Sequence, residues 1–239
     1  MMKDNTTNRV ALVTGSSRGI GRILVEHLLE KNFIVHGVSR SAQNSVEHEL
    51  YHHHVCDLQD AESIQDIFRT LRRNGIQLDT VINNAGVLTS QYAMILSPQA
   101  AKDMVLTNLW APFLVSREAA RLMRKTGWGR IVHIGSMAPT LEAEGDSVYA
   151  ACKAGLQMLS NVMAREFSSL NITSNVIGIS AFESDMLQQL DQKNLAKVME
   201  QLPISRKAEA KDITNLLDFF ISEESSYITA QTVYLAGAH

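Results

Sequence analysis

RVALVTGSSRGIG, residues 9–21, places a short apolar run directly before a glycine-rich turn that contains Gly15, Gly19 and Gly21. The run RVALVT (9–14) is predicted as a buried strand. Apolar residues then recur at the spacing of a helix: Ile20, Ile23, Leu24 and Leu28. Glycines between a strand and a helix let backbone N–H groups and the helix dipole face a phosphate. Such a turn can be purely structural, but its position after the first strand favours a nucleotide site.

Further β-type runs follow at regular intervals along the chain. They are FIVHGVS (33–39), HHHVCD (52–57), TVIN (80–83), GRIVHIGS (129–136), ITSNVIGI (172–179) and TVYLA (232–236). Segments with a helical pattern lie between these runs. They are an apolar repeat at 64–71, a long region over about 98–125, and residues 147–169. This alternation predicts an α/β fold, a Rossmann-type doubly wound parallel sheet with helices on both faces, in a single domain over 1–239. Ligands of such sheets bind outside the carboxyl ends of the strands.

Composition narrows the class of protein. The 239 residues are 45% hydrophobic and 20% charged, and the net charge of −3 gives no electrostatic reason to expect nucleic acid or an anionic membrane. No apolar segment approaches the length of a membrane span, and MMKDNTTN (1–8) lacks the apolar core of a signal peptide. The only two cysteines, Cys56 and Cys152, stand in different contexts, so no disulfide framework is expected and a reducing compartment fits. We therefore expect a cytoplasmic protein.

SVYAACKAG (147–155) sets Tyr149 and Lys153 at i and i+4, which places both side chains on one face of a helix. A phenol is a poor acid at neutral pH, and a nearby ammonium group lowers its pKa. The pair can therefore be an acid and its activator, or simply two surface residues of an amphipathic helix.

Four motifs in register decide between these readings, because together they resemble the short-chain dehydrogenase/reductase family. TGSSRGIG (14–21) matches the family's TGxxxGxG, and NNAG (83–86) matches its motif after the fourth strand. The match continues nearly to the end, through PISRKAE (203–209) and SYITAQTVYLAG (226–237). The catalytic tetrad is matched in order and spacing by Asn108, Ser136, Tyr149 and Lys153.

The resemblance implies reversible hydride transfer between a nicotinamide and a carbonyl or alcohol. Tyr149 is then expected to be the general acid, and Lys153 to lower its pKa and hold the nicotinamide ribose. Ser136 is expected to orient the substrate oxygen, and Asn108 to hold a water that links Lys153 to solvent.

Charge near the second strand favours NADPH over NADH. NAD-binding proteins usually carry an acidic residue at the end of this strand, where the present chain has Ser39 and Arg40. With Arg18 of the glycine turn, these residues suit a 2′-phosphate, although Arg40 can also be a solvated loop residue. The cofactor contacts that the resemblance implies are Gly15, Ser17, Arg18, Gly19, Ile20, Gly21, Ser39, Arg40, Asp57, Leu58, Asn84, Ala85, Gly86, Tyr149, Lys153, Ile179 and Ser184.

Histidines in the third strand raise a different possibility. Alternation would put His52, His54 and Cys56 on one face, and these residue types can bind a metal. No second ligand cluster accompanies them, and histidines near a sheet edge are more often solvated. No metal site is expected.

Motif order is most similar to the β-ketoacyl-carrier-protein reductase branch, which implies reduction of a 3-oxoacyl thioester on an acyl-carrier protein in fatty-acid or polyketide synthesis. The chain departs from that branch at three places, one of which is the final glycine pair, altered to Gly237-Ala238. Ile179-Ser180 replaces Pro-Gly, so we expect a less preorganised loop beside the nicotinamide, and Leu170-Asn171 replaces Arg-Gly, a possible contact for an acidic carrier. Arg121, Arg124 and Lys125 could supply another contact.

Two alternatives remain open at this stage. A dehydrogenase of a free alcohol, sugar or steroid ketone would share the tetrad and differ in a substrate lid over about 182–205. A family member that is only a subunit or scaffold would lack activity altogether. The resemblance also implies a homo-oligomer, a tetramer, in which small residues on one helix allow close approach: Ala150, Ala151, Ala154 and Gly155.

Overall fold

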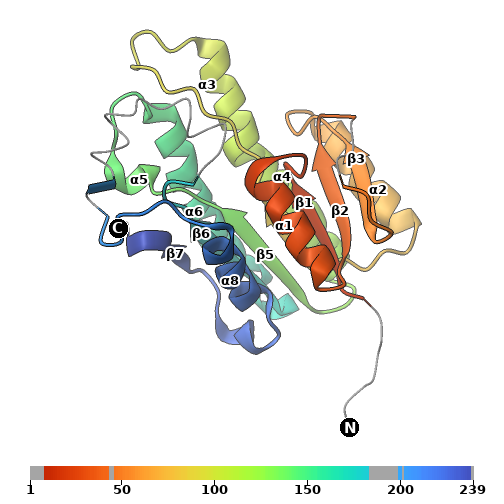
Figure 1. The fold of residues 1–239 in the computed structure, drawn as a ribbon. Helices are drawn as coiled ribbons and strands as arrows, with labels where there is room; N and C mark the ends of the chain where they lie inside the picture. Colours follow the sequence, from red (N-terminus) through yellow and green to blue (C-terminus); the bar gives the residue numbers. More distant parts are fainter. Residues whose placement is uncertain (1–7, 43–45, 183–198, 201, 238–239) are drawn as a thin grey trace.

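Parallel strands form one sheet in this computed structural model, which describes residues 8–42, 46–182, 199–200 and 202–237 (Figure 1). Within them the sheet has seven strands in the order β3-β2-β1-β4-β5-β6-β7. The strands are β1 (Val10–Thr14), β2 (Ile34–Ser39), β3 (Tyr51–Val55), β4 (Thr80–Asn83), β5 (Gly129–Ile134), β6 (Ile172–Gly178) and β7 (Thr232–Tyr234). Each overlaps a run predicted as a strand, and the ends differ by at most two residues, the usual uncertainty of such boundaries. The order reverses between β1 and β4, where such sheets bind ligands.

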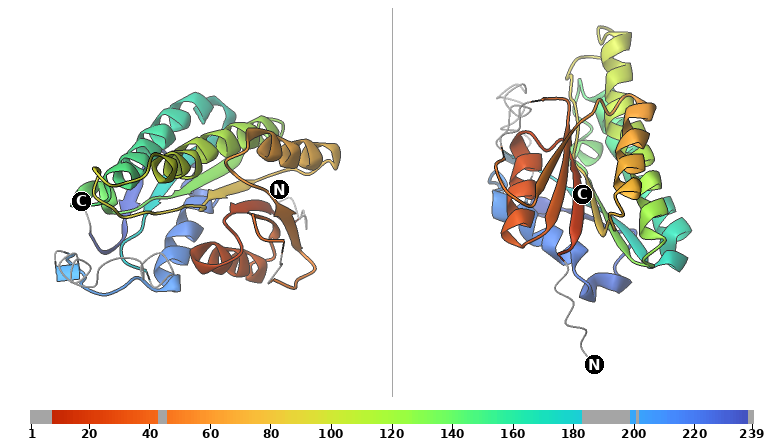
Figure 2. Two further views of the ribbon diagram at one scale, coloured as in Figure 1. Left: turned by 90° about the horizontal axis from the view of Figure 1, so that it is seen from above. Right: turned by 90° about the vertical axis from the view of Figure 1, so that its right-hand side faces the viewer.

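Helices cover both faces of the sheet, which confirms the doubly wound architecture (Figure 2). One face carries α1 (Gly19–Glu30) and α8 (Ala210–Ile221), and the other carries α2 (Ala61–Arg73), α4 (Ala111–Met123) and α6 (Ser147–Phe167). Shorter helices are α3 (Pro98–Val105), α5 (Ala138–Leu141), η2 (Ser168–Leu170), η4 (Glu224–Tyr227) and η5 (Leu235–Gly237). In the described part of the chain, no helix has both the length and the apolar character needed to cross a membrane.

Each face of the sheet has its own apolar core. Alternate residues of β1 point to opposite sides, so Leu12 packs in the core under α2 and α4, and Val13 packs in the core under α1 and α8. Every residue of β1 and β5 is buried, as expected for a parallel sheet that is covered twice. The carboxyl edge of the sheet is thereby held between two packed layers.

The long helix predicted over about 98–125 is divided in three. After α3 comes a π-helical turn, η1 (Leu106–Trp110), and then α4. A π-helical turn contains one extra residue, and such turns frequently lie at functional sites. This one contains Asn108 and begins where α3 leaves the body of the molecule (Figure 1).

The segment after β6 makes backbone hydrogen bonds with two other parts of the chain. The carbonyl of Ile179 accepts a hydrogen bond from Met137 N at 3.0 Å, and the carbonyl of Ala181 accepts one from Ala208 N at 2.7 Å. The side chain of Ile179 is buried in the core under α1 and α8. Ser180 does not have a positive φ, so no glycine is needed there. The reduced preorganisation expected at Ile179-Ser180 stays a prediction about the loop before the cofactor binds. Residues 183–198 and 201 of the predicted lid, including Ser184, lie outside the described residues.

Candidate active site

The glycine turn brings the end of β1 against the segment after β4. A Cβ atom on Gly15 would lie 2.9 Å from Ala85 Cα, and one on Gly21 would lie 2.0 Å from the Gly15 carbonyl oxygen. Real Cβ atoms do not approach so closely, so both positions require glycine. The turn and the NNAG segment can therefore touch.

Thr14 fastens these two segments together. Its Oγ1 accepts hydrogen bonds from the backbone N–H groups of Asn84, at 3.0 Å, and Ala85, at 3.1 Å. The Asn84 side-chain amide donates in return to the Thr14 carbonyl at 3.0 Å and to the Gly15 carbonyl at 3.3 Å. Asn84 thus positions the loop with its side chain.

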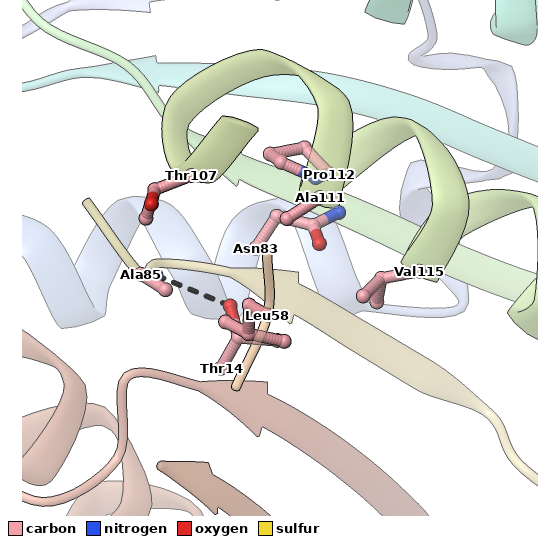
Figure 3. Close-up of a pocket in the computed structure, with 8 residues that line it drawn as sticks. All are labelled: Thr14, Leu58, Asn83, Ala85, Thr107, Ala111, Pro112 and Val115. Atoms are coloured by element: carbon pink, nitrogen blue, oxygen red, sulfur yellow. Dashed lines mark hydrogen bonds between the residues drawn. The ribbon is translucent and has the colours of Figure 1, made fainter. Parts of the chain in front are cut away.

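A narrow gap lies behind this junction, on the α4 side of the sheet (Figure 3). It is lined by Thr14, Leu58, Asn83, Ala85, Thr107, Ala111, Pro112 and Val115. Leu58 and Ala85, both predicted to contact the cofactor, meet here although they are 27 positions apart in the sequence. The neighbouring Asp57 is exposed, and its carboxylate accepts a hydrogen bond from Gln59 N at 3.0 Å.

The first turn of α1 is suited to a pyrophosphate. The helix begins without a side-chain N-cap, so its first N–H groups are available to an anion. Gly19 has φ of +54°, and a Cβ there would meet no atom within 4 Å, which marks the open side of the turn. Arg18 is exposed beside it, and Ser17 and Ile20 are half-buried. The residues present therefore fit a dinucleotide.

The loop after β2 carries the second predicted cation. Arg40 is exposed, whereas Ser39 is buried and its hydroxyl donates to the Ser41 carbonyl at 3.4 Å. Arg40 rather than the Ser39 hydroxyl is thus the group placed at the surface.

Three of the four tetrad residues lie close together, after the carboxyl end of β5 and in the first two turns of α6. Tyr149 and Lys153 are both buried, and Lys153 Nζ lies 5.7 Å from the centre of the Tyr149 ring. Ser136 makes a side-chain hydrogen bond with Tyr149. Lys153 Nζ donates to the Ile134 carbonyl at 2.8 Å, which anchors it to the sheet. The prediction that Tyr149 and Lys153 share one helix face is confirmed.

Burial dominates the protonation of these groups. It raises the pKa of Tyr149 to about 12, and the hydrogen bond with Ser136 opposes that rise. The direction is opposite to the one expected from Lys153, because loss of water disfavours the phenolate more strongly. Burial also lowers the pKa of Lys153 to about 8, and lowers the pKa of the underlying His133 to about 3, with help from the Lys153 charge. The site therefore holds a protonated phenol beside an easily deprotonated amine.

Asn108 lies in the π-helical turn and is fully buried. Its side-chain oxygen accepts from Val87 N at 2.9 Å, and its amide donates to the Val87 carbonyl at 2.8 Å. A Cβ on Gly86 would lie 3.3 Å from Asn108 Oδ1 and 3.9 Å from Lys153 Nζ. Gly86 thus keeps the space between these two polar groups open.

The histidines of β3 follow the predicted alternation, because His52 and His54 both contact His36 of β2 and so lie on one face of the strand. His36 of β2 hydrogen-bonds His54 at 2.9 Å and stacks on His52 with ring centres 5.0 Å apart, while Cys56 is buried beyond the strand. Burial lowers the pKa of His36 to about 4, helped by the neighbouring histidines. Across the described ranges, no group of three or more His, Cys, Asp or Glu residues is arranged to hold a metal ion.

Two structural contributors were not singled out from the sequence. Thr14 is the first residue of the motif TGSSRGIG (14–21), and its place in that motif is the sequence signal that could have identified it. Tyr51 reaches the glycine turn from the edge strand, a contact that depends on strand register and on Gly37.

Comparisons with known proteins agree with this geometry. A family model described as short chain dehydrogenase matches residues 9–195. The 3-oxoacyl-[acyl-carrier-protein] reductase FabG of Escherichia coli (strain K12) is 34% identical over an alignment of 238 residues, which covers 98% of this chain and 98% of that protein.

Solved structures give the same architecture. A 4-hydroxyisoleucine dehydrogenase in complex with NADH superposes with a TM-score of 0.86 at 26% identity, over 95% of this chain and 96% of that one. A short chain dehydrogenase from Leptospira borgpetersenii with bound NAD+ gives a TM-score of 0.88 at 24% identity, over 100% and 96%, and supports the fold alone.

Proposed function

Because this chain belongs to the short chain dehydrogenase family and is an oxidoreductase, we propose that it reduces 3-oxoacyl thioesters on an acyl-carrier protein with NADPH. The observation that carries the proposal is the hydrogen bond of Ser136 with the buried Tyr149, one helical turn from the buried Lys153, beside a glycine turn suited to a dinucleotide. The relative from Escherichia coli, alike over nearly the whole length, supports the substrate class.

Each residue of the site has a defined task in this reaction. The reduced nicotinamide, when bound, supplies the hydride. Tyr149 keeps its proton over the physiological range and donates it to the substrate oxygen as negative charge develops there. Ser136 donates a hydrogen bond to the same oxygen, and Lys153, with a pKa near the working pH, returns a proton toward Tyr149. Asn108 fixes the Val87 backbone that borders the site.

The cofactor preference follows from the charges around the two loops. Arg18 and Arg40 are both exposed, one in the glycine turn and one after β2, and the end of β2 carries no acidic residue. A 2′-phosphate gains charge-assisted hydrogen bonds from arginines. Nicotinamide use is common to the family, and the choice of NADPH is our proposal.

Arg40→Ala should weaken NADPH binding by about 1.5–3 kcal/mol, the contribution of a charge-assisted hydrogen bond, and leave NADH binding nearly unchanged. Fluorescence titration with both cofactors measures this. Arg22→Ala is the matched control, because Arg22 is exposed on α1 and pairs with Glu26 at 2.8 Å. Equal affinities of the wild type for both cofactors would contradict the preference.

The substrate is tested by following NADPH absorbance with a 3-oxoacyl thioester, presented both on acyl-carrier protein and on a small thiol. Turnover of the thioester supports the proposal. Turnover of free hydroxy acids or sugars alone, with the thioester inert, would favour the second candidate, a dehydrogenase of free alcohols. The solved 4-hydroxyisoleucine dehydrogenase is the observation in favour of that candidate.

Docking of an acidic carrier protein requires a basic surface, which we propose near the end of α4. Arg124 and Lys125 are exposed there, whereas Arg121 is engaged with Glu118 at 2.9 Å. Asn171 hydrogen-bonds the Gly127 carbonyl at 3.2 Å, which places the altered Leu170-Asn171 pair beside this surface. The protein is proposed to work in the cytoplasm, in keeping with two buried free thiols, Cys56 and Cys152.

We propose that the protein is a homo-oligomer, a tetramer, whose contact includes α6. Ala151, Ala154, Met158 and Val162 form an exposed stripe along this helix. The other two small residues face inward, because Ala150 packs beside Tyr149 and Gly155 lies against Leu109.

Light scattering at micromolar concentration should give a mass above that of one chain. Met158→Glu should lower it, because a carboxylate is costly in an apolar interface. Arg73→Glu, an exposed change on α2, is the control and should leave the mass unchanged. A wild type with the mass of a single chain would rule out the oligomer.

A further inference from the structure

Tyr51 lies across the neighbouring strand. It starts β3, at the edge of the sheet, and pairs with Val35 of β2. Its ring passes over Gly37, where a Cβ atom would lie 2.1 Å from the Tyr51 hydroxyl. Any other residue at position 37 would displace the ring. Because Gly37 has no side chain, the Tyr51 side chain can cross β2 and reach the glycine turn at the end of β1.

The hydroxyl of Tyr51 ends on the glycine turn. It donates to Ser16 Oγ at 3.3 Å, and Ser16 is fully buried beneath the turn. Burial raises the pKa of Tyr51, so the hydroxyl keeps its proton. Two buried hydroxyls thus satisfy one another across two strands.

His53 extends this contact to the loop after β2. Its Nδ1 lies 3.3 Å from the Tyr51 hydroxyl, and its Nε2 lies 2.8 Å from the Ser41 carbonyl oxygen. A carbonyl oxygen can only accept, so Nε2 is the donor. Nδ1 of a neutral His53 is then an acceptor, so the single hydroxyl proton of Tyr51 is shared between Ser16 Oγ and His53 Nδ1. Polar contacts of 2.8 to 3.3 Å therefore join Ser16 of the glycine turn to Ser41, through Tyr51 and His53.

We propose that Tyr51 and His53 form a brace that holds the glycine turn and the loop after β2 at the separation a 2′-phosphorylated adenosine requires. This inference rests on the proposed use of NADPH. The two ends of the brace lie within two residues of Arg18 and Arg40, one in each loop. Tyr51 and His53 are positioning residues, since they act on the cofactor only through these loops.

The brace should matter more for NADPH than for NADH. The glycine turn has separate backbone anchors to β2, because Gly15 N and Ser16 N donate to the Val38 carbonyl at 2.8 and 3.2 Å. These anchors do not depend on Tyr51, so a pyrophosphate would still meet an ordered turn. A 2′-phosphate held from both loops depends in addition on their spacing, which sets the distances to both cations.

Tyr51→Phe in the full-length protein tests the brace, because it removes the hydroxyl and keeps the ring. We expect the dissociation constant of NADPH to rise about three- to tenfold, the range for loss of one neutral hydrogen bond, while that of NADH changes less than about twofold. Adenosine 2′,5′-bisphosphate and 5′-AMP should repeat this difference without the nicotinamide. Tyr227→Phe, at a residue 98% exposed, is the matched control.

His53 supplies a second set of variants. His53→Ala should lower the NADPH/NADH preference as Tyr51→Phe does, and the double variant should be hardly worse than either single one, because both break the same chain. His53→Gln should retain more of the preference than His53→Ala, since its amide can still donate to Ser41. If Tyr51 and His53 had a purely structural role, these variants would weaken the binding of NADPH and NADH equally.

The outcomes separate the two proposals. A wild type that binds NADH as tightly as NADPH overturns the proposed cofactor. The brace is overturned if the wild type prefers NADPH and Tyr51→Phe either keeps the full preference or loses affinity for both cofactors equally. The proposed function then stays in place.

Discussion

Tyr149→Phe should lower the rate of carbonyl reduction by about three orders of magnitude, within the range that general acid catalysis contributes. Cofactor affinity should fall by no more than about fivefold, because only one buried hydroxyl with a net contribution of about 1 kcal/mol is removed. The ring packs among Met104, Ala138 and Val148, and those contacts are unchanged by the substitution.

The pKa of Tyr149 strengthens this expectation. At about 12 it leaves the phenol protonated throughout the pH range in which the protein would be assayed. The proton that neutralises the developing oxyanion therefore comes from a group that Phe cannot replace.

Stopped-flow or steady-state NADPH absorbance measures the rate, and fluorescence titration measures binding. Tyr92→Phe is the matched control: its hydroxyl donates to Glu144 at 2.8 Å at the protein surface, and its loss should leave turnover intact. A Tyr149→Phe variant that keeps most of the wild-type rate would falsify the assignment of the acid.

Lys153→Met should abolish most of the activity, about a hundredfold or more, and yet leave the protein as stable as the wild type or more so. Lys153 is a buried cation whose only hydrogen bond recorded in the described residues goes to the Ile134 carbonyl, and its pKa falls from an ordinary 10.5 to about 8. That difference corresponds to a cost of about 3 kcal/mol for keeping the charge in the folded protein. Met fills a similar volume without it.

The pH dependence has a definite sign. Below pH 8 the lysine is charged in both the folded and the unfolded protein, so the full cost is present. Between about 8 and 10.5 the unfolded chain binds more protons, and the stability of the wild type rises with pH. Lys153→Met lacks this proton, so its advantage should be largest at neutral pH and should shrink across that window.

Thermal unfolding of both proteins at several pH values measures this advantage. Loss of the bond to Ile134 offsets part of the gain, and we expect a midpoint about 2–4 °C higher at pH 7. Turnover and cofactor titration are measured on the same samples. A variant that is less stable at pH 7, with a pH dependence equal to that of the wild type, would show that the buried charge is not costly.

The fold was largely predictable from the sequence because parallel strands covered on both faces are nearly continuous apolar runs. RVALVT (9–14) and GRIVHIGS (129–136) are recognisable on their own, and both became fully buried strands. The helix α8 was not predicted, although Ile213, Leu217 and Phe220 recur at helical spacing. The π-helical turn at Asn108 was not predicted, because residues 98–125 were predicted as one helix, whereas the extra residue shifts the apolar face of α4 by about 100° relative to that of α3.

The sequence predicted which residues form the candidate site, but it did not predict their hydrogen bonds or their pKa values. Motif spacing identified Ser136, Tyr149 and Lys153, which the fold brings together. The direction of the Tyr149 pKa depends on burial, which sequence spacing does not report. The bonds of Asn108 to Val87 and the reach of Tyr51 through Gly37 depend on tertiary register. Contacts of this kind arise only when distant segments are placed in three dimensions.

Cys152 lies between Tyr149 and Lys153 on α6, buried, with its pKa raised by burial, and Cys56 is likewise buried with a pKa of about 11. Both thiols are therefore protonated and shielded, and an alkylating reagent can attack them only when the structure opens. The rate of alkylation at Cys152 accordingly reports how often α6 opens transiently to solvent. A ligand that closes the site should slow labelling there more than at Cys56, which gives a substrate screen that requires no turnover.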